Sequence, residues 1–360
     1  MRRRAGSRHV SAAATLLAAA TIVTGAAAPA GPVEREFLRR QLGFSQPDIA
    51  RASRGTPVAR TLAAPDSHEI AVAGLVRIRV SPQAFLARFR DIASFKQGAM
   101  VLQVGRFSDP PRAEDLAALT FEDQDIAAIR SCRPGKCDVK LSSDAMQAFR
   151  AEVNWSAPDY REQASALGRR MLLEYVQRYL QGGHAALAAY DDKAHPVRLA
   201  DEFRALLDHA PYLAAYAPEL RQYLLDYPRG RLAGTDDFVY WSKESFGLKP
   251  VVSLTHVVIY LRPGGDIVMA TKDLYSSHYM EASLGLTVLG DASAEAGVPA
   301  VDVLYLNRSR ADALRGTFGG LARGSVARRQ RDAMEKEMRR LKARLEAAVK
   351  DGVAQSVRRP

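Results

Sequence analysis

The chain has 360 residues, of which 47% are hydrophobic and 25% are charged, with a formal net charge of +11. This composition is ordinary for a globular protein of one large or two smaller domains, and it excludes a disordered or fibrous chain. The basic charge is concentrated at the C-terminal end, because the residues from Arg308 onward include 15 Lys or Arg and 6 Asp or Glu. The body of the chain is close to neutral, so a nucleic-acid-binding function is not indicated.

Residues 1–30 predict an export signal. Three arginines, Arg2 to Arg4, precede an uncharged stretch from Val10 to Ala30 that ends in a small-residue pattern. These are the basic, apolar and cleavage regions of a signal peptide, so we expect cleavage after Ala30 and a periplasmic or secreted protein. A retained membrane anchor is the alternative, since about 20 apolar residues can span a bilayer.

Residues 31–105 predict the first part of an α+β domain. Short helices are expected at 34–42 and 45–51, followed by extended segments at 57–62 and 68–80. Ser81 and Pro82 then open a helix, because Ser caps helix starts and Pro suits the first turn. Residues 98–105 predict another strand.

Residues 106–235 predict a mainly helical insertion. The apolar spacing favours helices at 114–119, 123–130, 143–153, 161–180, 184–190, 199–208 and 218–226. Cys132 and Cys137 flank a Pro-Gly turn within it, which brings their Cα atoms to the separation that a disulfide needs. A structural disulfide is the favoured interpretation outside the cytoplasm, and a redox-active pair is the alternative.

Residues 236–360 predict antiparallel strands and a basic terminal helix. Strands are expected at 238–241, 251–261, 267–275, 281–289 and 301–306, and a helix from residue 309 or 325 to 349. Both faces of 251–261 are apolar, which predicts that one face packs on the terminal helix while the other lines a core or a cavity. Asn307 to Arg310 can cap that helix or meet an anionic headgroup, and the cap is favoured.

Two segments resemble the START-like superfamily of polyketide cyclases and lipid-transfer domains. Residues 76–91 resemble its first strand, Ser-Pro turn and first helix, and residues 316–347 resemble its terminal helix, with Leu341, Lys342, Leu345 and Glu346. The resemblance implies an α+β fold in which an antiparallel sheet grips a long C-terminal helix around an apolar pocket. It implies no catalytic residue. The chain also resembles an uncharacterised family of exported bacterial proteins, which implies no mechanism.

Histidines and carboxylates of the strand region are the only catalytic candidates. His256 and His278 would need to meet on adjacent strands, with Glu244 or Glu281 as the orienting carboxylate. A core histidine bonded to a Tyr or a carbonyl is the favoured alternative. The usual zinc, nucleophile and nucleotide motifs are absent, so neither a metal nor a cofactor is predicted.

Aromatic side chains around 240–279 are the candidates for a ligand pocket, since aromatic groups with a few polar neighbours line such pockets. The six candidates are Tyr240, Trp241, Phe246, Tyr260, Tyr275 and Tyr279. A packed core is the alternative.

The sequence favours binding over catalysis. We expect an exported protein that binds or carries a hydrophobic or lipid-like ligand, with the terminal helix able to contact an anionic membrane. The alternatives are a hydrolase-like or cyclase-like enzyme that uses a His/Glu pair in an apolar pocket, and an envelope protein that binds a partner through its C-terminal helix.

Overall fold

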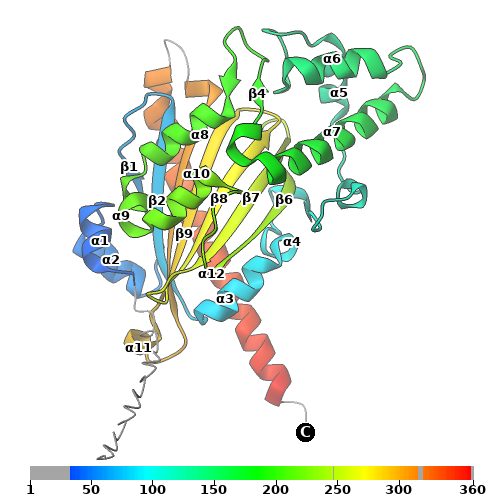
Figure 1. Ribbon diagram of the computed structural model, residues 1–360. Coiled ribbons are helices and arrows are strands. Elements are labelled where there is room, and N and C mark those ends of the chain that lie inside the picture. Colours follow the sequence, from blue (N-terminus) through cyan, green and yellow to red (C-terminus); the bar gives the residue numbers. More distant parts are fainter. Residues whose placement is uncertain (1–32, 246, 315–318, 358–360) are drawn as a thin grey trace, which may run out of the picture.

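A computed structural model describes residues 33–245, 247–314 and 319–357, so the predicted export signal lies outside the described residues. Its centre is one antiparallel sheet of eight strands in the order β1-β2-β10-β9-β8-β7-β6-β3 (Figure 1). The α+β class expected from the sequence is therefore confirmed. The strands are β1 Val58–Leu62, β2 Glu69–Ile78, β3 Val101–Arg106, β6 Thr235–Glu244, β7 Val251–Leu261, β8 Ile267–Ser276, β9 Met280–Asp291 and β10 Val301–Ala311.

The sheet is covered on both faces, as the two apolar faces of β7 predict. Leu254 and Val258 belong to one buried core, and Val257 and Ile259 belong to another on the opposite face. Successive side chains of a strand point to opposite faces, so a central strand covered on both sides is apolar throughout.

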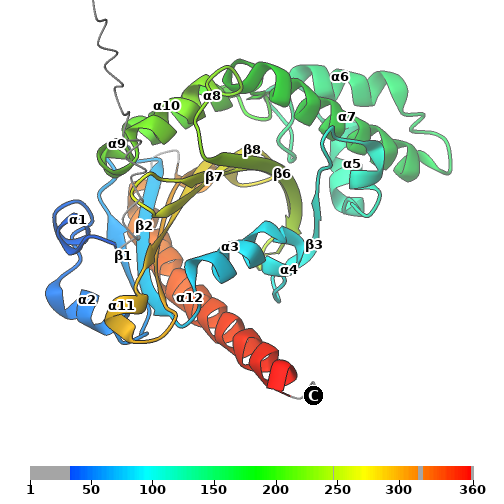
Figure 2. The ribbon, with the colours of Figure 1, turned by 60° about the horizontal axis from the view of Figure 1, so that its bottom comes forward.

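Three helices lie on the concave face of the sheet, which curls around them in Figure 2. They are α3 (Pro82–Arg90), α4 (Ile92–Phe95) and α12 (Gly319–Val357). The Ser81 side chain accepts a hydrogen bond from the backbone N–H of Ala84, so α3 begins as the Ser-Pro pair predicts.

Helix α12 packs mainly on β1 and β2. Met334 and Met338 are buried there above Gly74, where an added Cβ would lie 2.4 Å from the Met338 sulfur. The expectation that the terminal helix packs on 251–261 is therefore met only indirectly. Val257 and Ile259 share the concave-face core with Met334 and Met338. The helix itself, however, packs mainly on β1 and β2, at one edge of the sheet and several strands away from β7.

Helices from two parts of the chain cover the convex face. The segment between β3 and β6 supplies α7, α8, α9 and α10, which lie outside the sheet in Figure 2, and the N-terminal helices α1 and α2 lie beside β1 and β2. A smaller core around Phe149 and Leu167 joins α5, α6 and α7. These helices are α1 Arg35–Arg40, α2 Gln46–Ser53, α5 Asp123–Ser131, α6 Ser143–Glu152, α7 Tyr160–Gly182, α8 Leu199–Asp208, α9 Pro211–Tyr216 and α10 Pro218–Asp226.

Cys132 and Cys137 form the predicted disulfide, with their Cα atoms 4.6 Å apart. The helix expected at 184–190 is wrong, because a single 3₁₀ turn (Gly183–Ala186) leads into a two-stranded sheet of β4 (Ala189–Tyr190) and β5 (Val197–Arg198). The remaining short elements are the 3₁₀ turns η1 (Ala113–Leu116) and η3 (Asp312–Leu314) and the helix α11 (Ser293–Ala296).

The predicted helix cap at 307–310 is also wrong. These residues continue β10, paired with β2 and β9, and their arginines make buried ion pairs. Arg308 pairs with Glu69, and Arg310 with Glu202 at 2.5 Å. The long-range ladder and these ion pairs override a local sequence that favours a cap. Within the described ranges, no helix has the length and apolar character needed to cross a membrane.

Candidate functional site

The concave face of the sheet has two unlike halves. Toward the end where α3 begins, the inward side chains are apolar and tightly packed. None of them is more than 2% exposed: Val257, Ile259, Met269, Leu289 and Val303. This half is filled by α3 and α12.

The other half carries polar side chains from five neighbouring strands and from the residue that follows α4. Many of them keep solvent-accessible surface although they lie in the middle of central strands. We call this set the concave patch: Lys96, Tyr240, Ser242, Glu244, Ser253, Thr255, Thr271, Asp273, Ser283, Thr287, Tyr305 and Asn307. Partial exposure of mid-strand positions means that no described side chain packs fully over them.

Hydrogen bonds organise the concave patch. The Thr255 hydroxyl donates to Asp273 Oδ1 at 2.9 Å, and Lys96 Nζ donates to Glu244 Oε1 at 2.5 Å. Burial raises the pKa of Asp273 to about 6, although the Thr255 bond and the Lys96 charge oppose this rise. Burial also raises the pKa of Tyr240, whose ring lies 5.4 Å from Lys96 Nζ. The patch therefore combines hydroxyls, a proton-accepting carboxylate and one ion pair.

A β-bulge just after Asp273 turns Tyr275 away from the patch. Leu254 pairs with Tyr275 and Thr255 with Asp273, so the register shifts around Leu274. An extra residue in one strand lets two nearby side chains change face. Asp273 points to the concave side by regular alternation with Thr271, while Tyr275, beyond the bulge, packs on Tyr190 on the other side.

Gly285 lies at the centre of the patch. A Cβ there would lie 2.2 Å from Thr271 Oγ1 and 3.5 Å from the Tyr305 ring. Thr271 and Tyr305 therefore pack directly over this position, and a side chain here would displace them and distort the patch.

The structure does not bring the predicted histidines together. His256 lies on the convex side, where its Nδ1 is 2.9 Å from the Tyr179 hydroxyl and its Nε2 is 3.5 Å from Asp237 Oδ1. His278 lies past the end of β8 and bonds Asp125 at 2.9 Å. Ser277, next to His278, donates its N–H to the Val252 carbonyl, four residues before His256 on β7, which is about 13 Å at the rise of a β-strand.

The two predicted carboxylates also lie apart from His256. Glu244 is in the concave patch and is bonded to Lys96 and Ser242. Glu281 is buried near the start of β9. The four catalytic candidates therefore do not form one site.

The predicted aromatic pocket is dispersed as well. Only Tyr240 is in the concave patch, and Phe246 lies outside the described residues. Trp241 donates to the Asp115 carbonyl at 2.7 Å, and Tyr260 to Glu219 at 2.8 Å. The Tyr279 hydroxyl accepts from the backbone of Lys249 at 3.1 Å, and Tyr275 packs on Tyr190.

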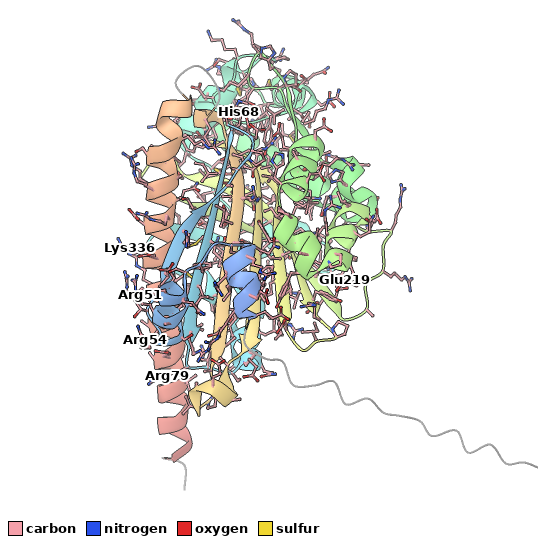
Figure 3. All side chains as sticks on the ribbon, turned by 90° about the vertical axis from the view of Figure 1, so that its left-hand side faces the viewer. Arg51, Arg54, His68, Arg79, Glu219 and Lys336 are labelled. Carbon is pink, nitrogen blue, oxygen red and sulfur yellow. A yellow bond between two sulfur atoms is a disulfide. The ribbon has the colours of Figure 1, made fainter. Side chains whose placement is uncertain are left out.

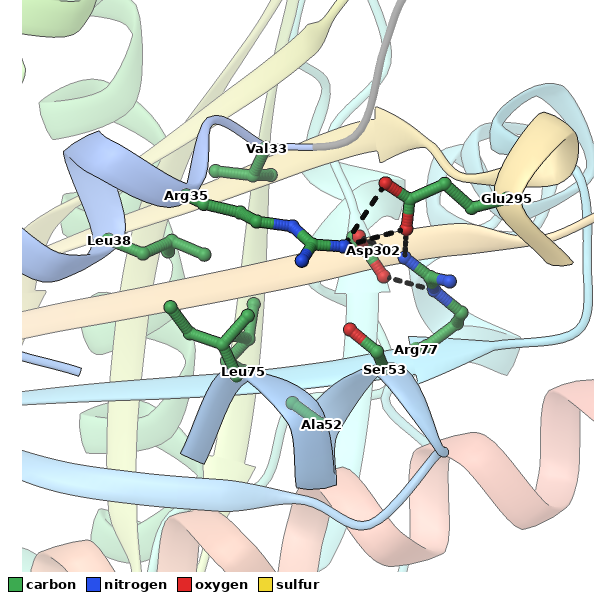
Figure 4. A pocket seen from close by; sticks show the side chains of 10 residues that line it. Val33, Arg35, Leu38, Ala52, Ser53, Leu75, Arg77, Glu295 and Asp302 are labelled. Carbon is green, nitrogen blue, oxygen red and sulfur yellow. Dashed lines mark hydrogen bonds and ion pairs between the residues drawn. The ribbon is translucent and has the colours of Figure 1, made fainter. Parts of the chain in front are cut away.

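Two enclosed or hollowed regions are lined in part by residues that make internal ion pairs. The first, drawn in Figure 4, holds only about 10 Å³ between α1, α2 and β2, room for one water at most. Its Arg77 makes a two-pronged ion pair with Asp302 at 2.7 and 2.8 Å, so it is a structural contact.

The second region is an open hollow of about 460 Å³ between 122–125 and 248–250. Its Glu122 pairs with Lys243 at 2.6 Å, and its Asp125 pairs with His278. Across the described ranges, no group of three or more His, Cys, Asp or Glu side chains is placed to bind a metal ion.

No family model, no curated protein and no solved structure matches this chain. The functional argument therefore rests on the geometry of the chain's own residues.

Proposed function

We propose that the protein binds an amphipathic, lipid-like molecule on the concave patch, outside the cytoplasm. The observation that supports this most is the change of character along one face of the sheet. Half of the concave face is apolar and filled by helices, and the other half is polar and incompletely covered. A helix-grip protein of the START-like kind would hold its ligand on this same side.

The boundary between the two halves offers both interactions that such a ligand needs. Its apolar part would bury surface against the partly exposed rings of Phe95 and Tyr305 at the edge of the packed half, at about 25 cal/mol per Å². Its polar group would bond the hydroxyls of the patch and the Asp273 carboxylate, which already accepts a hydrogen bond from Thr255. Asp273 can accept or donate a hydrogen bond near neutral pH, because its pKa is raised to about 6.

Ligand uptake tests this proposal. The full-length mature protein should bind a fluorescent fatty acid or a fluorescent phosphatidylethanolamine, and the two probes distinguish a free acid from a phospholipid. Ser283→Phe should weaken the binding by tenfold or more, because Ser283 is partly exposed in the patch and a ring would fill it.

Asp236→Asn is the matched control, since Asp236 is exposed and its partner Arg90 lies outside the patch. Its affinity should equal that of the wild type. If neither probe binds, and native mass spectrometry of the purified protein finds no bound lipid, the proposal is wrong.

A basic surface on one side of the molecule supports a second proposal, that the protein docks on anionic membrane. Arg51, Arg54, Arg79 and Lys336 lie on the same side in Figure 3, where α2 and the end of β2 meet α12. Within 323–349, six exposed basic residues face solvent against two exposed acidic ones, Asp332 and Glu337. Each basic residue near an anionic surface contributes about 1 kcal/mol, screened by salt.

Vesicle sedimentation tests the docking. The protein should bind vesicles with 30% phosphatidylserine at low salt and release at about 0.5 M salt, where screening is nearly complete. Arg51→Gln with Lys336→Gln should weaken the binding several-fold. Arg130→Gln with Arg150→Gln removes the same charge from exposed sites on α5 and α6 and should not. If both double variants lost the same amount of vesicle binding, only the net charge of the protein would matter, and the docking surface would be rejected.

No observation favours the alternative of a hydrolase or cyclase built on His256 and His278, because the two side chains have separate partners.

A further inference from the structure

Lys272 is a buried lysine that forms no ion pair with any residue that the structure describes. It lies on β8 on the convex side, only 1% exposed. No group in the described ranges accepts a hydrogen bond from its Nζ. Burial of an unpaired ammonium group costs several kcal/mol, and a buried lysine readily shifts its pKa, which suits it to act as a nucleophile.

Aromatic rings and histidines surround the Lys272 amine. Its Nζ lies 4.2 Å from the centre of the Phe203 ring on α8 and 5.1 Å from that of Tyr179 on α7. His256 is its direct partner across the ladder, and His184 packs against the same Phe203 ring at 6.0 Å. These groups leave the amine in an apolar, water-poor setting.

Next to the amine runs a chain of proton-carrying groups, Asp237, His256 and Tyr179. The Asp237 contact favours a hydrogen on His256 Nε2, so Nδ1 accepts from the Tyr179 hydroxyl. Burial lowers the pKa of His256 despite the opposing effect of Asp237, which keeps the ring neutral. Tyr179 therefore has a base behind its hydroxyl and the Lys272 amine beside its ring.

We propose that Lys272 is the attachment point for an aldehyde, which its amine binds covalently as an imine between the sheet and α7 and α8. The lysine nitrogen attacks the carbonyl carbon, and the carbonyl oxygen becomes a hydroxyl. The C–O bond then breaks, and the oxygen leaves as water with the two hydrogens that the nitrogen gives up. No oxidant or reductant is needed, and the Tyr179–His256 pair can pass the proton that the leaving hydroxyl takes.

Two further properties favour this reaction. Burial lowers the pKa of Lys272 to about 7, so a large share of the amine is neutral and nucleophilic at neutral pH. The aromatic walls suit an aromatic or unsaturated aldehyde, whose apolar part would replace the present contacts with Phe203. The site lies on the convex side of the sheet and does not depend on the concave patch.

Reductive trapping tests the inference on the full-length protein. The wild type is incubated with benzaldehyde and sodium cyanoborohydride at pH 7, and the modified lysines are located by peptide mass spectrometry. Lys272 should gain the mass of the aldehyde less one water plus two hydrogens, at least tenfold faster than the exposed Lys336. An exposed lysine is almost fully protonated at this pH.

Two controls separate reactivity from exposure and from folding. Lys140 is equally buried but ion-paired with Asp312 at 2.6 Å, so it should react most slowly of the three. Lys272→Met keeps a similar length and removes the amine, so it should lose the adduct while its far-ultraviolet spectrum is unchanged. If Lys272 in the folded wild type reacts no faster than Lys336, the inference is overturned, whatever the variant does.

Discussion

At the scale of a single residue, Lys272 contributes a pH-dependent part of the protein's stability. Burial lowers its pKa to about 7 in the folded protein, against about 10.5 in the unfolded chain. Between these values the unfolded state holds one more proton, so this residue makes the protein more stable as the pH rises from about 7 to 10.5. Below pH 7 both states are protonated and the full penalty is present.

Lys272→Met should remove that penalty. We expect the variant to be more stable than the wild type by roughly 3–5 kcal/mol at pH 6, with the gain shrinking toward zero near pH 10. Urea unfolding at the two pH values measures it, with Lys336→Met as the exposed control. A gain that is independent of pH would mean that the Nζ is already paired or hydrated, which would contradict both this prediction and the proposed imine site.

At the scale of the element, the sequence predicted strands and amphipathic helices well where local pattern and tertiary burial agree. The bounds of β7 (251–261), α8 (199–208) and α10 (218–226) are those expected. The segment 307–310 shows the opposite case. Its Asn, Ser and Arg side chains are poor strand formers, and partners remote in sequence, Glu69 and Glu202, hold it extended. No local pattern could reveal those contacts.

Helix α12 divides into a packed part and a projecting part. Met334, Met338 and Leu345 are buried against the sheet, and the helix continues past them away from the body in Figure 1. Removal of 350–360 should leave the secondary structure and the melting temperature almost unchanged. Removal of 325–360 should prevent folding, because it exposes one apolar face of β1 and β2.

Circular dichroism and thermal melting of the two truncated proteins measure the difference. Cooperative unfolding after the longer deletion would mean that the sheet folds without α12. The terminal helix would then be an appended binding element, as the interaction-protein alternative requires.

At the scale of the whole molecule, the candidate sites could be predicted only in part. The polar residues at alternate positions, Thr271 and Asp273 on β8 with Tyr305 and Asn307 on β10, interrupt strands that otherwise look like core, and this was a usable signal for the concave patch. Their meeting depends on the register across five strands, which no local pattern specifies. The burial of Lys272 depends on α7 and α8, whose position over β8 no local pattern specifies.

The molecule has more than one core, which predicts that it does not open as a single unit. Ile126, Phe149 and Leu167 form a cluster of α5, α6 and α7 separate from the two cores of the sheet. The Cys132–Cys137 disulfide lies in this outer cluster and closes only a short loop. A loop of about six residues contributes about 2 kcal/mol by restricting the unfolded chain.

Replacement of both cysteines by Ser should therefore speed amide hydrogen exchange in α5 and α6 by about 30-fold, the rate equivalent of 2 kcal/mol. Exchange in β7, β8 and β9 should stay within twofold of the wild type, because these strands share no core with the disulfide. Hydrogen-exchange mass spectrometry under native conditions resolves the two regions. Equal acceleration in the central strands would instead mean that insertion and sheet unfold together, through links such as Lys140–Asp312 and Asp125–His278.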